Sequence, residues 1–421
     1  MLLLSFIRQH PERVKERLRL RNFDRLDWID ELIVLDEARK KQQFERDEVR
    51  ARIKQLSHET GSLMRSGNLE EAERKKAEVA ECKIRLADLS ALELLEEKIN
   101  HILVQIPNLP ADGVPAGRNA EDNEVVREGG VQPSLPAQPL AHWDLARQYG
   151  LIDFELGNKI TGSGFPVYLG RGARLQRALI QYFLDFNIAA GYTEYAPPYL
   201  VNEASALGTG QLPDKEGQMY YVGEDKLYLI PTAEVPVTNI YRDNILKESD
   251  LPVRMTAYTP CFRREAGSYG KDVRGLNRVH QFDKVEIVQI AHPDKSYQAL
   301  EEMLGHVERL LQTLHLPYRI LKLCAGDMGF ASALTYDFEV FSAAQQRWLE
   351  VSSVSNFESF QTNRMKIRFK DGKDNRLAHS LNGSSLALPR IVASLLENHQ
   401  KAKSIELPEV LHRYFGAEAI S

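Results

Sequence analysis

The stretch CFRREAGSYGKDVRG at residues 261–275, which continues to HQFDKVE at residues 280–286, decides the expected fold. Its pattern is that of two strands joined by a glycine-rich loop. Arg263 ends the first strand. The loop region carries three further cations, Lys271, Arg274 and Arg278. Arginine suits bidentate contact with phosphate, so several cations around one hairpin indicate a site for a polyanion. The alternative interpretation is an exposed charged turn.

The returning strand favours the first interpretation. Side chains alternate along a strand, so Phe282, Lys284 and Glu286 share one face. An aromatic ring and a carboxylate on one sheet face suit a purine ring and an ammonium group better than they suit water. The hairpin is therefore the leading candidate for a nucleotide site.

The C-terminal two thirds of the chain has the composition of an α+β domain. Beyond residue 140, short strand-like runs alternate with isolated helices, and no βαβ rhythm with a glycine-rich first turn is present. The expected fold is an antiparallel β-sheet flanked by helices. Neither GxxxxGK[ST] nor GxGxxG occurs, so neither common phosphate loop is available.

The first 106 residues differ from the rest, with one proline before Pro107 and only Gly61 before Gly67. Apolar residues at three-four spacing predict two long helices, at about 27–57 and 69–106, with turn chemistry at 58–62 and 65–68. Their narrow apolar seam indicates an antiparallel coiled-coil arm over about 27–106, within a domain at 1–106. A proline- and glycine-rich linker at 107–139 then leads to the catalytic domain at 140–421.

Basic residues are concentrated on the first arm helix, where residues 39–54 carry seven bases against three acids. The sequence pattern fits a solvated helix face as well as it fits an RNA-contacting stripe. The candidates for RNA contact are Arg39, Lys40, Arg46, Arg50 and Lys54.

Composition limits the class of protein. A net charge of −5 over 421 residues requires any nucleic-acid footprint to be local. Cys82, Cys261 and Cys324 lie far apart, which predicts neither disulfides nor a zinc site. No signal peptide or membrane span is evident, so we expect a cytoplasmic protein with no membrane partner.

Two further segments carry candidate chemistry. In a strand at 348–353, Glu350 and Ser352 would share a face while Ser353 opens the next turn, and such oxygen ligands suit Mg²⁺ beside phosphates. Pro389 marks a helix start, which places Arg390 in the first turn of a buried helix. A cation there opposes the helix dipole, so it needs an anionic partner, either a phosphate or a carboxylate.

Together these segments resemble the three signature motifs of class II aminoacyl-tRNA synthetases, and more narrowly the bacterial seryl-tRNA synthetase family. The resemblance covers nearly the whole chain, including the arm and the segments at 208–213 and 231–234. The block FRREAGS…RVHQFDKVE is highly specific for it. The first motif matches a helix at about 172–188 and the following strand with Pro198, which in the family form a homodimer interface.

The resemblance implies roles for matching residues. Arg263 would hold the α-phosphate and the reacting carboxylate, and Arg390 the γ-phosphate, which makes these two the catalytic residues. Glu265 would read the adenine amino group, Phe282 would stack on adenine, and Glu350 with Ser353 would bind Mg²⁺. The implied ATP site comprises Arg263, Arg264, Glu265, Val279, Phe282, Glu350, Val351, Ser352, Ser353 and Arg390.

The implied serine site has two carboxylates and several hydroxyls, which fit a small substrate with an ammonium and a hydroxyl group. Leaving buried polar groups unpaired is costly, so such a site should reject alanine. Its residues are Thr232, Ala233 (through its backbone), Glu234, Arg263, Glu286, Asn382 and Ser384. The chain departs from the family at Ser385, Val354 and Phe341, which puts the pocket shape in question.

The implied reaction uses ATP and Mg²⁺ to form seryl-adenylate and pyrophosphate, and then transfers serine to the 3′ end of tRNA(Ser) held by the arm. No structural zinc is expected, which argues against a threonyl enzyme. The resemblance leaves open whether tRNA(Sec) is a second substrate, and which carboxylate takes the ammonium. A tRNA-independent amino-acid ligase would lack the arm. A non-catalytic RNA-binding paralogue would have lost Arg263, Glu350 or Arg390.

Overall fold

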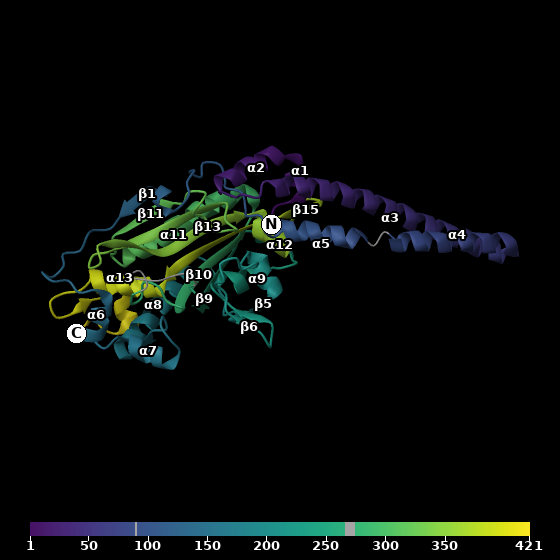
Figure 1. Cartoon of the computed structure of the whole chain (residues 1–421). Helices are drawn as coiled ribbons and strands as arrows, with labels where there is room; N and C mark the ends of the chain where they lie inside the picture. The colour runs from purple at the N-terminus through teal and green to yellow at the C-terminus, as the bar shows by residue number, and fades with distance from the viewer. Residues whose placement is uncertain (89–90, 266–273) are drawn as a thin grey trace. The chain divides into compact units, whose positions relative to one another are not determined.

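The computed structural model describes residues 1–88, 91–265 and 274–421. The chain divides into two compact units, whose elements are labelled in Figure 1. The helical unit comprises Leu2–Arg19 and Phe23–Pro107. The sheet unit comprises Met1, Leu20–Asn22 and Asn108–Ser421.

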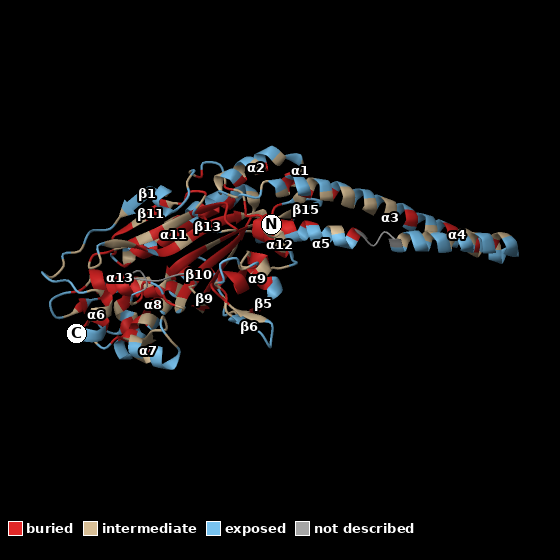
Figure 2. Ribbon diagram, in the orientation of Figure 1, coloured by how far each residue is buried: buried red, intermediate tan, exposed pale blue. Residues whose placement is uncertain are grey.

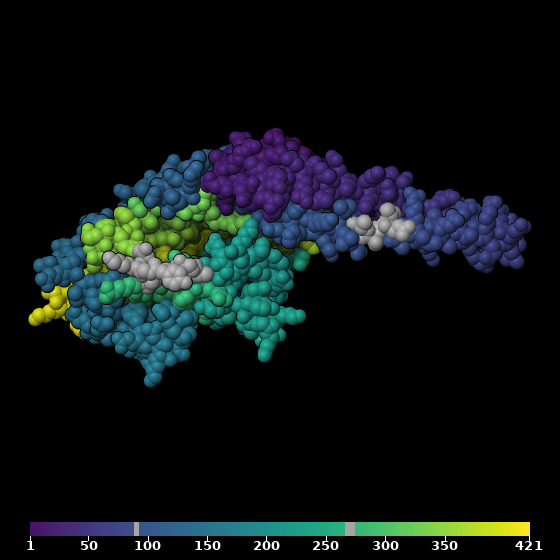
Figure 3. Space-filling view, viewed as in Figure 1, coloured from purple at the N-terminus to yellow at the C-terminus, as the bar shows by residue number. Residues whose placement is uncertain are grey.

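The helical unit is dominated by a long antiparallel hairpin. Its helices are α1 (Leu4–Gln9), α2 (Pro11–Leu20), α3 (Asp27–Arg65), α4 (Leu69–Asp88) and α5 (Ala91–Leu103). Ion pairs join Arg52 to Glu78 at 3.3 Å and Lys75 to Glu59 at 3.2 Å, which fixes α4 antiparallel to α3. The space-filling view shows α4 packed along α3 (Figure 3). The predicted coiled-coil arm is confirmed.

The predicted turn at 58–62 was wrong, because α3 continues through it to Arg65. Leu56 and Thr60 are buried in the hairpin, and the Thr60 hydroxyl donates to the Leu56 carbonyl at 2.7 Å, one helical turn back. Burying this seam outweighs the roughly 1 kcal/mol that Gly61 costs inside a helix. The chain reverses instead at residues 66–68, where Gly67 adopts a φ of +83°.

The second predicted arm helix is described as two helices, α4 and α5, and residues 89–90 between them lie outside the described residues. The middle of the seam on α3 is polar. Within the described residues, Gln42 Oε1 and Arg46 Nε are buried without a hydrogen-bond partner.

The sheet unit is built on one eight-stranded sheet. In spatial order its strands are β1 (Glu124–Gly129), β11 (Tyr318–Lys322), β12 (Leu334–Ser342), β13 (Arg347–Glu358), β16 (His379–Ala387), β10 (Gln281–Ala291), β9 (Val253–Phe262) and β4 (Thr193–Glu194). All neighbours are antiparallel except β4, which runs parallel to β9. The predicted antiparallel sheet is confirmed. The predicted linker at 107–139 supplies the edge strand β1.

Three long helices cover one face of this sheet: α8 (Gly170–Ala189), α11 (Ser296–Thr313) and α13 (Leu388–Asn398). Their apolar side chains, such as Leu179, Leu304 and Leu395, share one buried core with Phe338 and Val354 of the sheet. Figure 2 shows this buried layer in red. The helix predicted at 172–188 is therefore present. Pro198, however, lies between β4 and β5 rather than in a strand, because proline has no N–H for a ladder.

The remaining elements are short and surround the sheet. They are η1 (Ala120–Asp122), α6 (His142–Gln148), β2 (Ile152–Asp153), α7 (Phe154–Ile160), β3 (Val167–Tyr168), β5 (Leu200–Asn202), α9 (Glu203–Thr209), β6 (Tyr221–Val222), β7 (Leu227–Leu229), α10 (Glu234–Asn239), β8 (Ile245–Lys247), η2 (Glu248–Asp250), η4 (Pro293–Lys295), α12 (Ser359–Met365), β14 (Arg368–Asp371), β15 (Asp374–Leu377), β17 (Ile405–Glu406), α14 (Glu409–Phe415) and β18 (Ala419–Ile420). None of the described helices combines the length and apolar character needed to cross a membrane.

Candidate active site

A cavity of the sheet unit, about 700 Å³ in volume, lies against strands β10, β13 and β16. It brings together segments that are far apart in the sequence: residues 209–219, the ends of the 261–286 hairpin, β13, and the start of α13. The lining includes most of the predicted site. Those residues are Thr232, Glu234, Arg263, Glu265, Val279, Phe282, Glu286, Glu350, Val351, Ser352, Ser353, Asn382, Ser384 and Arg390.

Two predicted residues do not line the cavity. Ala233 is fully buried, and its predicted contact was through the backbone. Arg264 points elsewhere, with its guanidinium 6.0 Å from the centre of the Tyr220 ring and its N–H donating to the Gln218 carbonyl. Lys271, one of the predicted loop cations, lies outside the described residues.

Arg263 follows directly after β9 and is held by the returning strand. Its N–H donates to the His280 carbonyl at 2.9 Å, and its own carbonyl lies 3.0 Å from His280 Nδ1. Its guanidinium lies 5.2 Å from the centre of the Phe282 ring. Both predicted nucleotide contacts therefore stand side by side in the cavity. Glu265 accepts a hydrogen bond from Arg278.

Arg390 is the third residue of α13, in the first turn as predicted. Its Nε donates to the Asn277 carbonyl at 2.9 Å and its Nη1 to the Glu350 carbonyl at 2.7 Å. Among the described residues its nearest ion-pair partner is Glu350 Oε2, at 3.7 Å and beyond hydrogen-bond distance. Backbone carbonyls thus orient the guanidinium, and its ion pair with Glu350 is too long for a hydrogen bond, so the group can take an anionic ligand as well.

A β-bulge in β13 changes which residues share a face. Glu350 pairs with Glu339 and Ser353 pairs with Asp337, so Val351 is an extra residue in the ladder. Glu339 and Asp337 are two apart on β12 and share a face, so Glu350 and Ser353 share that face too. The predicted pairing of Glu350 with Ser352 across a regular strand was therefore wrong, and Ser353 lies inside β13 rather than at a turn.

Oxygen ligands gather on this face. Ser353 Oγ donates to Asp337 Oδ1 at 2.5 Å, and burial next to the Glu350 carboxylate raises the pKa of Asp337 well above its ordinary value. Among the described residues no group of three or more His, Cys, Asp or Glu side chains could hold a metal ion alone. Mg²⁺ usually takes one or two carboxylates together with substrate phosphates, and Glu350 with Ser353 fits that donor set.

The Glu286 carboxylate is buried and closely surrounded. It accepts from Thr232 Oγ1 at 3.2 Å and from Asn382 Nδ2 at 3.0 Å, and Lys284 Nζ lies 2.5 Å from Oε2. Lys284 is itself buried in the cavity wall. The sequence predicted Lys284 on this face but assigned it no role. The sequence signal for a role was its position between Phe282 and Glu286 on the same face of the strand.

Glu234, the first residue of α10, lies in the same cavity with different surroundings. Burial raises the pKa of its carboxyl to about 7. Its Oε1 accepts from Gln361 Nε2 at 2.6 Å, and Gln361 Oε1 accepts in turn from Ser380 Oγ at 2.7 Å. Gln361 was not predicted from the sequence, since a glutamine in a helix carries no local signal of a buried role.

Of the residues that depart from the family pattern, Ser385 and Val354 are fully buried and Phe341 is half-buried. Ser385 Oγ donates to Asn187 Oδ1 at 2.8 Å, Val354 packs in the main core, and Phe341 makes an edge contact with the Trp348 ring. None of these three lines the cavity.

The predicted RNA-contacting bases of α3 fall into two groups. Arg39 and Lys40 each lie 2.7 Å from a carboxylate oxygen of the buried Asp36. Arg46 donates to Gln43. Arg50 and Lys54 are exposed and have no ion-pair partner within the described residues, so their charges are the most available to a ligand.

Comparisons with known proteins agree with this architecture. Residues 1–110 match the seryl-tRNA synthetase N-terminal domain, and residues 220–399 match the tRNA synthetase class II core domain (G, H, P, S and T). The serine–tRNA ligase of Salinibacter ruber is 51% identical over 420 residues, which span 99% of this chain and 98% of that protein. The chain belongs to the seryl-tRNA synthetase family.

Other members of the family extend the match. The serine–tRNA ligase of Chlorobaculum parvum is 47% identical over the full length of both chains. The crystal structure of seryl-tRNA synthetase from Pyrococcus horikoshii complexed with ATP superposes with a TM-score of 0.92 at 34% identity, covering 100% of this chain and 99% of that one. The predicted family, fold class and enzyme class, a ligase, are confirmed.

Proposed function

We propose that the cavity is where this serine–tRNA ligase activates serine with ATP. The observation that carries the proposal is the convergence of Arg263, Phe282, Glu350 and Arg390 on one cavity from four separate segments. An aromatic ring, two oriented guanidinium groups and a carboxylate are what a nucleoside triphosphate with its metal ion needs.

The surroundings of the two buried carboxylates, Glu286 and Glu234, support different roles for them in binding the serine hydroxyl and the serine ammonium. The Lys284 ammonium balances the charge of Glu286, which leaves Glu286 suited to accept a hydrogen bond from the serine hydroxyl. Glu234 is hydrogen-bonded by the neutral Gln361 and has no cation at hydrogen-bond distance among the described residues, so once it ionises its charge is suited to the serine ammonium. Thr232, Asn382 and Ser384 complete the polar wall, with the Ala233 backbone.

Activation then depends on position and electrostatics. Arg263 stabilises the charge that develops on the α-phosphate as the serine carboxylate attacks in line. Arg390 receives the departing pyrophosphate. Glu350 and Ser353 would hold Mg²⁺, which neutralises phosphate charge when it is bound. No side chain is required to remove a proton in this step.

In the second step a terminal hydroxyl of the tRNA attacks the adenylate. We assign tRNA(Ser) binding to the domain at 1–106, with 107–139 as connection and 140–421 as catalytic domain. The protein would act in the cytoplasm as a homodimer. Charging of tRNA(Sec) can be measured beside tRNA(Ser) in the same assay.

The test of the site is serine-dependent exchange of pyrophosphate into ATP, run with each of the twenty amino acids. Serine alone should support exchange. Arg263→Ala should reduce exchange by at least 1,000-fold, because it removes charge stabilisation made mainly in the transition state. Normal exchange by this variant would refute the assignment of Arg263.

The test of the hairpin is its shortening. Positions 46 on α3 and 85 on α4 lie opposite each other, as the nearby Arg52–Glu78 pair shows. A short glycine linker can therefore replace residues 46–85 and join the two shortened helices. Exchange should stay within twofold of the parent, while charging of tRNA(Ser) should fall by at least 100-fold. Charging that survives this deletion would contradict a tRNA-binding role for the distal hairpin.

A further inference from the structure

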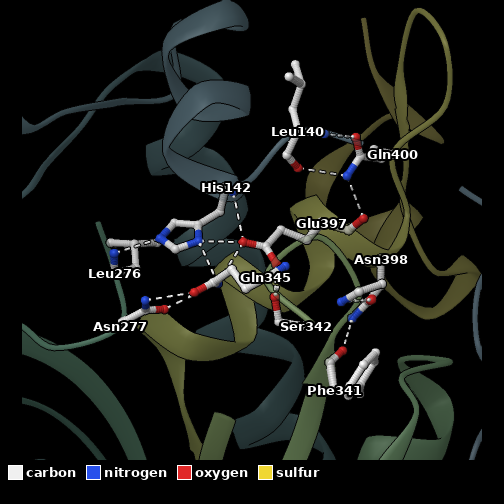
Figure 4. Close-up of polar contacts among 11 residues, drawn as sticks. Leu140, His142, Leu276, Asn277, Phe341, Ser342, Gln345, Glu397, Asn398 and Gln400 are labelled. Carbon is white, nitrogen blue, oxygen red and sulfur yellow. Dashed lines mark hydrogen bonds and ion pairs between the residues drawn. The ribbon is translucent and has the colours of Figure 1, made fainter. Parts of the chain in front are cut away.

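A fully buried hydrogen bond between a histidine and a glutamate near the cavity has no part in the activation chemistry. His142, at the start of α6, has its Nδ1 2.7 Å from Glu397 Oε1 in the last turn of α13 (Figure 4). Glu397 also accepts from the His142 N–H, from Gln345 Nε2 and from Ser342 Oγ. A buried carboxylate with four donors is fully satisfied, so its position is fixed.

The other ring nitrogen of His142 holds the end of the 261–286 hairpin loop. Its Nε2 accepts from the Leu276 N–H at 2.8 Å, so the ring hydrogen is on Nδ1 and is donated to Glu397. Gly275 makes room for this contact, because a Cβ there would lie 2.3 Å from Nε2, and its φ is +67°. The next residue of α6, Trp143, lies under the Arg274 guanidinium at 4.3 Å.

The backbone held in this way is the backbone that orients Arg390. The Asn277 carbonyl accepts from Arg390 Nε at 2.9 Å, and the Asn277 side chain donates to Gln345, which itself donates to Glu397. Helix α13 therefore holds residues 276–277 twice, through Arg390 in its first turn and through Glu397 in its last. Figure 4 shows His142, Leu276, Gln345 and Glu397 in this network.

We propose that His142 and Glu397 are positioning residues for ATP: they fix residues 276–277 so that the Asn277 carbonyl aims the Arg390 guanidinium at the polyphosphate. The inference rests on the proposed role of Arg390. Neither side chain touches substrate. Their effect should appear in the use of ATP and not in the binding of serine.

Two substitutions of His142 separate its hydrogen bond to Glu397 from its hydrogen bond to Leu276. His142→Gln can keep an acceptor for the Leu276 N–H, while His142→Asn can keep the donor to Glu397 but cannot reach Leu276. In pyrophosphate exchange, His142→Asn should lower kcat/KM for ATP about tenfold, and His142→Gln by less than threefold. The KM for serine should stay unchanged in both. Equal effects of the two variants, or equal changes for ATP and serine, would overturn the proposal.

A matched control measures how the loss of a buried histidine contact by itself changes the melting temperature and the KM for ATP. His306 is also buried, with its Nε2 2.7 Å from Asn187 Oδ1, and it does not line the cavity. His306→Asn should lower the melting temperature without altering the KM for ATP. If His142→Asn does not fold, Gln345→Met tests the proposal instead. It removes the hydrogen bonds that link Glu397 to Asn277, and Gln345 is partly exposed, so the variant is expected to fold. It should raise the KM for ATP about fivefold; an unchanged KM would overturn the proposal.

A double-mutant cycle with Arg390→Ala distinguishes this inference from the function on which it rests. If His142 acts through Arg390, adding His142→Asn to Arg390→Ala should cost less than twofold more in kcat/KM for ATP. Additive losses would overturn the positioning role alone. Normal exchange by Arg390→Ala would instead overturn the assignment of Arg390.

Discussion

Glu234 and Glu286 occupy the same cavity, but their neighbours give their charges different roles. Glu286 has a lysine at 2.5 Å, whereas Glu234 is hydrogen-bonded by an amide and burial raises its pKa to about 7. A sequence shows both carboxylates and cannot show this difference, because Lys284 and Gln361 acquire their roles only through burial. The matching of residue types to a family therefore predicted which residues would form a serine site, while their charge balance could be read only from the fold.

The raised pKa of Glu234 predicts a pH dependence of stability. The folded chain keeps a proton on this carboxyl up to pH about 7, while an unfolded chain releases it near 4.5. Stability from this group is present below pH 4.5 and is lost as pH rises through about 7. Glu234→Gln keeps an acceptor for Gln361 and cannot ionise. It should therefore be more stable than the parent at pH 8, on the order of 2 kcal/mol, and nearly equal at pH 4.5.

Thermal unfolding of both proteins at the two pH values measures this difference. The same variant should raise the KM for serine about 100-fold at pH 8, since the ammonium loses a charged partner. A stability difference that does not change with pH would show that Glu234 is not the titrating group.

At the scale of elements, two features could not be predicted from the sequence, because packing in the folded chain overrides local preference. Helix α3 runs through Gly61 since the hairpin seam buries Leu56 and Thr60 nearby. Strand β13 contains a bulge, which alternation of side chains cannot reveal. The helical periodicity, by contrast, correctly predicted the hairpin. The glycine-rich loop between two strand patterns predicted the antiparallel β9–β10 pair, and Pro389 predicted the start of α13.

The hairpin predicts a difference between its basic residues. Arg50 and Lys54 are exposed without ion-pair partners in the described structure, whereas Arg39 and Lys40 are held by Asp36. Arg50→Ala with Lys54→Ala should weaken tRNA binding about tenfold at low salt. It should also reduce the slope of log affinity against log salt by about 2, because two phosphate contacts are lost.

The matched control for this experiment is Lys41→Ala, which removes an exposed charge from the same helix. Binding is measured by titration of tRNA(Ser) across a range of salt concentrations. An unchanged salt slope in the double variant would contradict the assignment of these two bases to phosphate contact.

At the scale of the whole molecule, the proposed dimer has a candidate surface on the sheet unit. Large apolar side chains are exposed at the start and end of α8 and at β5, in and beside the segments predicted to match the first class II motif. They are Leu169, Ile188, Tyr199 and Leu200. Exposed apolar side chains that form one patch often mark an interface, and the proposed dimer would cover these four. Light scattering should give twice the chain mass of 47.9 kDa.

Tyr199→Asp with Leu200→Asp should convert the protein to a monomer, because each buried apolar side chain contributes roughly 1.5–3 kcal/mol and a charge there must be desolvated. Val131→Asp is the control, since Val131 is 84% exposed and lies outside this region of the sequence. A dimer that survives the double substitution would place the interface elsewhere.

The bulge in β13 makes the length of this strand as important as its composition. The one surplus residue turns Ser353 toward the same side as Glu350, and the later residues of the strand are displaced by the same step. Loss of a single codon between these two positions would leave the amino-acid types almost intact and yet rotate the downstream side chains to the opposite side of the sheet. Among natural variants, small in-frame deletions here should be far more damaging than conservative replacements.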